Sequence, residues 1–238
     1  MSYAAVFLDL DNTLYPYAPC NEAGMRSAQS TFREHGYDVD RARFDALYGA
    51  ARRETKRETR GTAASHERHI YFKRLVQHHL GTLDATLADA LAAAYWDGFI
   101  DEMTLCDGVH SVLSTLRSAG TSIAIVTNLT AHVQLTKLSR LGIDGQVDRL
   151  ITSEEVGREK PSALPFTAGL TAFDCRPSEV LMVGDNVTAD IAGANAIGMD
   201  TALFIADGRS EGAETPRDEH TRPDYRLDAF AALTEVTG

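Results

Sequence analysis

Five short apolar runs recur along the chain, each bounded by polar or turn residues: residues 4–8, 123–126, 150–151, 180–183 and 202–205. A strand that is buried on both faces requires such continuous apolarity, and strands of this kind are typical of parallel sheets. Between the later runs, apolar side chains follow helical spacing. One stripe stops at Gly120, and the next follows Thr130, a predicted N-cap, and stops at Gly142. The pattern predicts an α/β fold with a doubly wound parallel sheet.

More than a hundred residues separate the first apolar run from the second, and the stretch between them has apolar residues at helical spacing. Its breaks fall near Gly36, Gly61 and Gly81. We therefore predict an α/β core from residues 1–15 and 105–238, and a cap of about four helices from residues 16–104. The polar residues 207–225 predict a surface loop before a short final segment.

The composition is that of a globular protein and argues against several other classes of protein. Hydrophobic residues make up 44% and charged residues 24% of the 238 positions, as in ordinary globular chains. The net charge of −11 argues against a nucleic acid polymer as partner. Three widely spaced cysteines, Cys20, Cys106 and Cys175, indicate neither a disulfide framework nor a zinc site. Without an apolar membrane span or a leader pattern, we expect a cytoplasmic protein with no membrane partner.

Two carboxylates, Asp9 and Asp11, directly follow the first apolar run. Open α/β sheets bind their ligands at the carboxyl ends of their strands, so the position of this DxD pair matters more than the pattern itself. Asn12 and Thr13 predict a turn there. The later predicted strands end in further polar residues: Thr127, Asn128, Lys160, Asp185 and Asn186, with Asp190 close behind. Each has an ordinary explanation as a cap, a turn residue or a surface lysine, but together they predict one polar site.

Four motifs in this order resemble the haloacid dehalogenase (HAD) superfamily of phosphohydrolases: DLDNTLY from residue 9, VTN from residue 126, Lys160 before Pro161, and VGDNVTADIAGANAIGM from residue 183. The resemblance spans residues 6–199. It implies a Rossmann-like HAD core with a helical cap inserted after the first strand, as in subfamily IA. Only about thirty residues separate Thr127 from Lys160, which leaves no room for a cap there.

The resemblance also implies roles for individual residues. Asp9 would attack phosphorus and form an aspartyl-phosphate, and Asp11 would protonate the leaving alkoxide and later activate water. Backbone amides after Asp9 and Asn128 would help to hold the phosphoryl oxygens. The implied catalytic residues are Asp9, Asp11, Thr127 and Lys160. The implied phosphate-binding residues are Leu10, Thr127, Asn128 and Lys160.

A cation is expected among these carboxylates, because closely spaced negative charges repel one another. Oxygen ligands at a phosphoryl-transfer site favour Mg²⁺. The resemblance implies that its ligands are an Asp9 carboxylate oxygen, the Asp11 backbone carbonyl and Asp185. Asp190 would act through water or orient Lys160, and Asn186 is either a supporting residue or a turn residue.

We therefore predict a Mg²⁺-dependent phosphatase acting on a small phosphorylated metabolite, such as a sugar phosphate or a nucleotide. A phosphosugar mutase is an alternative that the residues exclude less firmly than a 2-haloacid dehalogenase, which has no leaving alkoxide for Asp11 to protonate. A non-enzymatic phospho-receiver would be about half this length and lack the insertion. The sequence leaves open whether the protein is a monomer or a homodimer.

The cap is the expected seat of substrate specificity, since a lid can close over the phosphate. Residues 41–74 hold ten basic and four acidic side chains. This local excess of positive charge could attract an anion although the chain as a whole is acidic. His66, Arg68 and His69 are candidate substrate contacts, although a solvated helix face is the simpler interpretation. His78 and His79 are predicted to lie on the surface.

Overall fold

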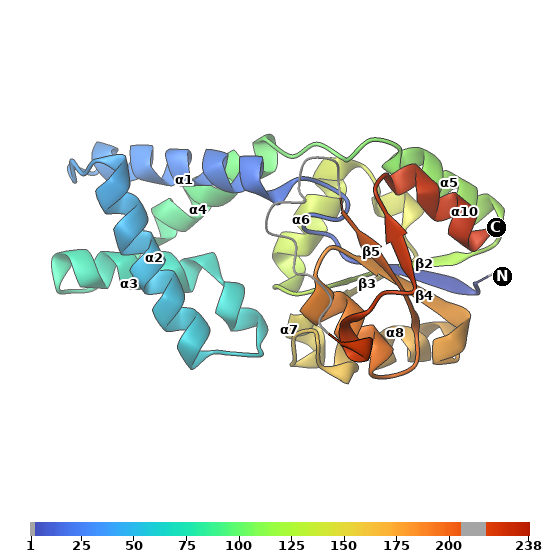
Figure 1. The fold of residues 1–238 in the computed structure, drawn as a ribbon. Coiled ribbons are helices and arrows are strands. Elements are labelled where there is room, and N and C mark those ends of the chain that lie inside the picture. Colours follow the sequence, from blue (N-terminus) through green and yellow to red (C-terminus); the bar gives the residue numbers. More distant parts are fainter. Residues whose placement is uncertain (1–2, 206–217) are drawn as a thin grey trace. The chain divides into compact units, whose positions relative to one another are not determined.

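The computed structural model describes residues 3–205 and 218–238 (Figure 1). The chain divides into two compact units, which we describe separately. Unit 1 comprises Met1–Pro16 and Thr104–Gly238, and unit 2 comprises Tyr17–Met103. None of the helices among the described residues is long and apolar enough to cross a membrane.

Unit 1 is built on a six-stranded sheet in the order β3-β2-β1-β4-β5-β6, with every neighbouring pair parallel. The strands are β1 (Ala5–Leu8), β2 (Ser122–Thr127), β3 (Arg149–Thr152), β4 (Val180–Gly184), β5 (Asp200–Phe204) and β6 (Tyr225–Leu227). The helices are α5 (Val109–Ser118), α6 (Ala131–Leu141), α7 (Ser153–Val156), α8 (Ala163–Phe173), α9 (Gly193–Asn195) and α10 (Leu233–Thr237), with a π-helical turn, η4 (Val187–Ala192). The predicted doubly wound α/β fold is confirmed.

Helices cover both faces of the sheet: α5 and α10 lie on one face, and α7 and α8 on the other (Figure 1). Because side chains alternate along a strand, Ala5 and Phe7 of β1 face α8, while Val6 and Leu8 face the opposite layer. All four side chains are fully buried. Burial on both faces explains why this strand is a continuous apolar run in the sequence.

The regular secondary structure of unit 2, all of whose residues are described, is helical. Its helices are α1 (Tyr17–Glu34), α2 (Arg41–Glu58), α3 (Arg68–Leu80) and α4 (Ala85–Asp101), with a short 3-10 turn, η1 (Ala63–His66). Asp40, Glu67 and Asp84 cap the N-termini of α2, α3 and α4 by accepting backbone N–H bonds. The helices α1 and α4 pack closely at Gly24, where an added Cβ would lie 2.6 Å from the Tyr95 carbonyl oxygen.

Two local sequence predictions differ from the structure. Thr130 occupies the N-cap position of α6 but its side chain makes no cap bond; instead the Glu154 carboxylate accepts the Ala131 N–H at 2.7 Å. The predicted loop over residues 207–225 lies partly outside the described residues, but its last residue, Tyr225, begins strand β6. A 3-10 turn, η5 (Glu219–Thr221), also falls within it. The short β6 is only partly buried, so it lacks the continuous apolar run of the inner strands.

Candidate active site

The polar residues at the strand ends gather at one edge of the sheet. Leu8 of β1 pairs with Ile125 of β2 on one side and with Val183 of β4 on the other. All three strands are parallel, so Asp9, Thr127 and Asp185 leave the sheet at the same edge. The carboxyl ends of strands at the centre of an open α/β sheet are the usual location of a ligand site.

Lys160 joins two of the acids at this edge. Its ammonium group donates to Asp9 Oδ1 at 2.7 Å, to Asp190 Oδ1 at 2.6 Å and to the Val126 carbonyl oxygen at 2.7 Å. These three bonds use all the hydrogens that an ammonium group carries. The Lys160 and Asp190 side chains are each 1% exposed, so their ion pair is buried. Lys160 is therefore fixed beside Asp9 rather than solvated on the surface.

The charges at this edge influence one another strongly. Burial raises the pKa of Asp9 well above its ordinary value; Lys160 opposes this effect, and the neighbouring carboxylates add to it. Burial also raises the pKa of Asp185, together with the charge of Asp190, to about 7. For Lys160 burial acts to lower the pKa, but the carboxylates of Asp190 and Asp9 outweigh burial and raise it. Lys160 thus keeps its charge at neutral pH, whereas Asp9 and Asp185 are acids that favour a compensating cation.

Two neighbouring features of the chain hold Lys160 and Asp190 in these positions. The Asn128 side chain accepts the Lys160 backbone N–H at 2.9 Å and donates to the Lys160 carbonyl oxygen at 3.4 Å. Asp190 closely approaches Gly184, where an added Cβ would lie 2.2 Å from Asp190 Oδ2. Only glycine permits that approach. Asn128 thus supports the lysine, and Gly184 leaves space for its buried partner.

Asp11 has a different cationic partner, Lys137 of α6. The Lys137 ammonium donates to Asp11 Oδ1 at 2.6 Å, and the Tyr15 hydroxyl donates to the same oxygen. The Lys137 side chain is fully buried, whereas the Asp11 side chain is 30% exposed. The two aspartates of the DxD motif are therefore held by two separate lysines.

Thr127 is held by the same helix. Gln134 Nε2 donates to Thr127 Oγ1 at 2.7 Å and to the Asn128 carbonyl oxygen at 3.2 Å. The carbonyl can only accept, which fixes the amide nitrogen of Gln134 toward this edge. A hydroxyl oxygen that accepts from an amide can still donate its own hydrogen, so Thr127 retains a donor for an anionic ligand.

Other predicted residues lie at the same edge with local partners. Asn186 Oδ1 accepts from the Thr188 and Ala189 backbone N–H groups, so its side chain caps η4. The backbone N–H that follows Asn128 donates to Ser153 Oγ at 2.9 Å, and that amide is therefore already engaged. Leu10 is fully buried beside the DxD aspartates.

Carboxylate oxygens of Asp9, Asp185 and Asp190 all lie within 4.8 Å of one another. Such a set of hard oxygen donors fits a divalent cation such as Mg²⁺. Both carboxylate oxygens of Asp190 already accept hydrogen bonds, Oδ1 from Lys160 and Oδ2 from the Asn186 backbone N–H at 3.1 Å, so Asp9 and Asp185 are the better placed side-chain ligands. The raised pKa values of these two acids agree with this assignment, because a bound cation would offset their burial.

Comparison with known families decides the class of protein: the haloacid dehalogenase-like hydrolase family matches residues 6–204. The chain belongs to this family. The resemblance predicted from the sequence motifs is thereby confirmed, and so is the prediction of an enzyme, a phosphoric monoester hydrolase of the HAD type.

Relatives and solved structures cover almost the whole chain. A ribulose-1,5-bisphosphate 5-phosphatase from Halopiger xanaduensis is 47% identical over 98% of both chains. A glyceraldehyde 3-phosphate phosphatase from Methanopyrus kandleri is 32% identical over 98% of this chain and 96% of its own. The HAD hydrolase YfnB from Bacillus subtilis, solved with magnesium bound, has a TM-score of 0.73 at 21% identity, covering 100% of this chain and 99% of that one. At that identity the likeness to YfnB establishes the fold alone.

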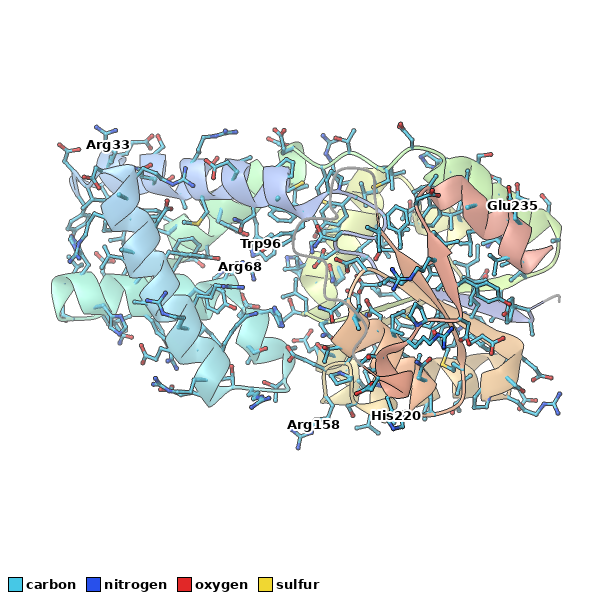
Figure 2. The ribbon with its side chains drawn as sticks, in the orientation of Figure 1. Arg33, Arg68, Trp96, Arg158, His220 and Glu235 are labelled. Atoms are coloured by element: carbon cyan, nitrogen blue, oxygen red, sulfur yellow. The ribbon has the colours of Figure 1, made fainter. Side chains whose placement is uncertain are left out.

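In this HAD hydrolase, several charged side chains of residues 41–74 in unit 2 interact with neighbouring residues of that unit. Arg68 is buried beside Trp96 (Figure 2). Its guanidinium carbon lies 5.2 Å from the ring centroid of Tyr95 and 5.1 Å from that of Trp96. Arg68 also donates to the Tyr17 hydroxyl at 2.5 Å. His69 lies 3.0 Å from the Glu67 carboxylate. Ion pairs join Arg41 to Glu22 and Asp45, and Arg74 to Glu54 and Glu58, while His78 Nε2 lies 3.0 Å from the Glu54 carboxylate.

The prediction that His78 and His79 lie on the surface is confirmed for His78 and holds only in part for His79. The His78 side chain is 41% exposed and lies on the surface as predicted. His79 is only partly exposed, because its ring packs against Phe32 and Tyr37 at centroid distances of 5.3 and 5.7 Å. Its aromatic packing partners are more than forty residues away in the sequence, which is why the local pattern did not reveal them.

Proposed function

We propose that the protein is a Mg²⁺-dependent phosphatase that hydrolyses phosphorylated sugar metabolites through an aspartyl-phosphate on Asp9. The observation that carries the proposal is that the two carboxylates of the DxD motif have different partners and different exposure. Asp9 is buried on Lys160, and Asp11 is more exposed on Lys137. A nucleophile and an acid need different surroundings. Burial raises the pKa of Asp9, so the charge of Lys160, and a cation when bound, would keep Asp9 ionised, while the more exposed Asp11 can exchange a proton.

In the first step, an Asp9 carboxylate oxygen forms a bond to phosphorus as the bond between phosphorus and the ester oxygen breaks. Asp11 gives its proton to the leaving oxygen, so the product departs as an alcohol. Lys160 offsets the negative charge on Asp9 and on the incoming phosphoryl group, and Thr127 donates its hydroxyl hydrogen to a phosphoryl oxygen.

In the second step, Asp11, now ionised, takes a proton from water while the water oxygen attacks phosphorus. The bond between phosphorus and the Asp9 oxygen breaks, which releases inorganic phosphate and restores the Asp9 carboxylate. Asp11 regains its proton in the same step, so both residues return to their starting states.

Asp9, Asp185 and the Asp11 backbone carbonyl would hold the Mg²⁺ ion. When bound, the ion would supply positive charge to the phosphoryl oxygens and offset repulsion between the buried carboxylates. The close approach of their carboxylate oxygens and the raised pKa values of Asp9 and Asp185 support these two as side-chain ligands. Asp190, already paired with Lys160, would orient that lysine instead.

The relatives support a phosphorylated sugar as the substrate class. The two described relatives take their names from a sugar bisphosphate and a triose phosphate, and the first is 47% identical over 98% of this chain. Ribulose 1,5-bisphosphate is therefore the first substrate to test, and glyceraldehyde 3-phosphate the second.

The test measures inorganic phosphate released from these two substrates and from an aryl phosphate, with Mg²⁺ or with EDTA. We expect Mg²⁺-dependent release that falls below about a thousandth of the wild-type rate in Asp9→Asn, because the nucleophile is lost. Asp228→Asn, at an exposed aspartate of unit 1, is the matched control and should keep the wild-type rate. No Mg²⁺-dependent release from any of the substrates would contradict the proposal, as would an active Asp9→Asn variant.

A further inference from the structure

We propose that Lys137 is a positioning residue that holds the Asp11 carboxylate in the orientation needed for proton transfer to the leaving group. This inference rests on the proposed function, in which Asp11 is the acid. It concerns a lysine that neither the motifs nor the family resemblance assigns. The observation behind it is the bond from the Lys137 ammonium to Asp11 Oδ1 at 2.6 Å.

The burial of Lys137 indicates a specific role. Its side chain is fully buried, although α6 has an exposed face on which a lysine would ordinarily be solvated. Removing an ammonium group from water is costly unless an anion compensates it. Asp11, 126 positions away in the sequence, provides such an anion when it is ionised, and its Oδ1 can still accept from Lys137 when the proton is on Oδ2. The fold therefore brings a buried cation from a neighbouring helix to one carboxylate of the DxD motif.

A second group fixes the same oxygen. The Tyr15 hydroxyl also donates to Asp11 Oδ1, and the Lys137 ammonium lies 5.6 Å from the centroid of the Tyr15 ring. The backbones of Asp11 and Tyr15 form an isolated β-bridge, which holds the two residues together. Two donors converging on Oδ1 restrict rotation of the carboxylate and direct proton exchange to Oδ2, since an oxygen that accepts two strong bonds is the poorer proton carrier.

The effect of Lys137 on the rate should depend on whether the leaving group needs a proton. A leaving alkoxide needs a proton from Asp11 as its bond to phosphorus breaks, whereas a dinitrophenolate ion is stable enough to leave without one. A misoriented Asp11 should therefore slow the hydrolysis of alkyl phosphates more than that of dinitrophenyl phosphate. A lysine that only stabilised the fold would lower both rates equally, because it would change only the fraction of active molecules.

The experiment compares kcat/KM for an alkyl phosphate, glycerol phosphate, with kcat/KM for 2,4-dinitrophenyl phosphate in wild type and in Lys137→Met. The ratio of the two constants does not depend on how much of the protein is folded. We expect this ratio to fall at least about tenfold in the variant, since proton transfer to the leaving group contributes about 10²–10⁴-fold to such reactions. An unchanged ratio would overturn the proposal.

Two further variants strengthen the comparison. Lys137→Gln removes the charge but keeps a polar side chain, so it replaces Lys137→Met if that variant folds poorly. It should also lower the ratio of the two kcat/KM values. Arg140→Met, at an exposed position of the same helix, should leave the ratio unchanged. A fall in the ratio for Arg140→Met as large as that for Lys137→Met would assign the effect to the helix and not to the lysine.

A double-mutant cycle tests whether Lys137 acts through Asp11. In an Asp11→Asn background, Lys137→Met should cause no further fall in the ratio, because the proton that the lysine helps to direct is already absent. An equal fall in both backgrounds would overturn the positioning role. Wild type without Mg²⁺-dependent hydrolysis of either ester would instead remove the proposed function itself, so the two failures are distinguishable.

Discussion

Asp9 and Asp11 are two positions apart, yet the structure gives them different partners and different exposure. Asp9 contacts Lys160 within a buried cluster that also contains Asp190, while Asp11 contacts Lys137 and Tyr15 at a more open position. Neighbouring residues of one motif can therefore perform different chemistry, because side chains from distant elements determine the surroundings of each.

The role given to Asp11 predicts a dissociation between metal binding and turnover. Asp11→Asn should bind Mg²⁺ about as tightly as wild type, because its proposed metal contact is a backbone carbonyl, while turnover falls by about 10²–10⁴-fold. Asp185→Asn should weaken Mg²⁺ binding, because it loses a ligand charge. Isothermal titration calorimetry with Mg²⁺ compares the variants. Equal losses of affinity in both would contradict the assignment.

Gln134 should influence phosphate binding through Thr127. Gln134→Leu removes the donor that holds Thr127 Oγ1, so the inhibition constant for inorganic phosphate should rise by up to about tenfold, the worth of one hydrogen bond. Competitive inhibition assays measure this constant. Gln77→Leu, at an exposed position of α3, is the control and should leave it unchanged. An unaltered constant in Gln134→Leu would show that Thr127 needs no support from α6.

At the scale of elements, α6 illustrates what the sequence could and could not reveal. Its apolar stripe predicted the helix, and Lys137 lies within that stripe, four positions after Val133 and four before Leu141. A lysine within a buried apolar stripe is unusual, and this signal could have identified Lys137 as a candidate site residue. Its partner could not be predicted from α6 alone, because Asp11 reaches it only when β1 and β2 pair.

The strands also divide into those that the sequence predicts and one that it does not. Inner strands buried on both faces are continuous apolar runs, so β1, β2 and β4 could be located from the sequence. Parallel pairing then made it predictable that their polar ends would meet. The short β6 was missed, because only Leu227 among its three residues is buried and its neighbours are polar or partly exposed.

Helix packing in unit 2 predicts opposite effects for two glycine substitutions. Gly24→Ala should lower the free energy of unfolding by about 1–3 kcal/mol, because the new methyl group would meet the Tyr95 backbone carbonyl at 2.6 Å. Gly49→Ala, inside α2, meets only the flexible end of Arg53 at 3.1 Å. It should raise the free energy of unfolding by up to about 1 kcal/mol through helix propensity. Urea unfolding measures both changes, and a neutral Gly24→Ala would contradict the close packing of α1 on α4.

At the scale of the whole molecule, the net charge of −11 includes a concentrated group of acids at one edge of the sheet. Asp9, Asp185 and Asp190 bring three carboxyl groups together, and Lys160 contacts two of them. Mutual repulsion among buried carboxylates favours either protonation or a bound cation. The stability of the protein should therefore depend jointly on pH and on Mg²⁺.

The direction of this dependence follows from Asp185, whose pKa rises from 3.8 to about 7 in the folded protein. Between these values the folded state binds more protons than the unfolded state, so stability without metal should fall as pH rises from about 4 to about 7. Mg²⁺ binds the ionised form, and its stabilising effect should therefore grow over the same range. Melting temperatures with Mg²⁺ or EDTA at pH 5.5 and pH 8 measure this. An equal rise in melting temperature at both pH values would contradict it.

The central claim is that Asp9 carries the phosphoryl group during turnover. The most direct measurement is rapid acid quenching of the enzyme during turnover of ³²P-labelled ribulose 1,5-bisphosphate with Mg²⁺. One portion of the quenched protein is counted for bound radioactivity, and a second is reduced with borohydride for peptide mass spectrometry. We predict that radioactivity is trapped on the protein and that Asp9 is converted to homoserine, as expected for an acyl phosphate. Turnover that leaves Asp9 unmodified, or that places the label on another residue, would contradict the account.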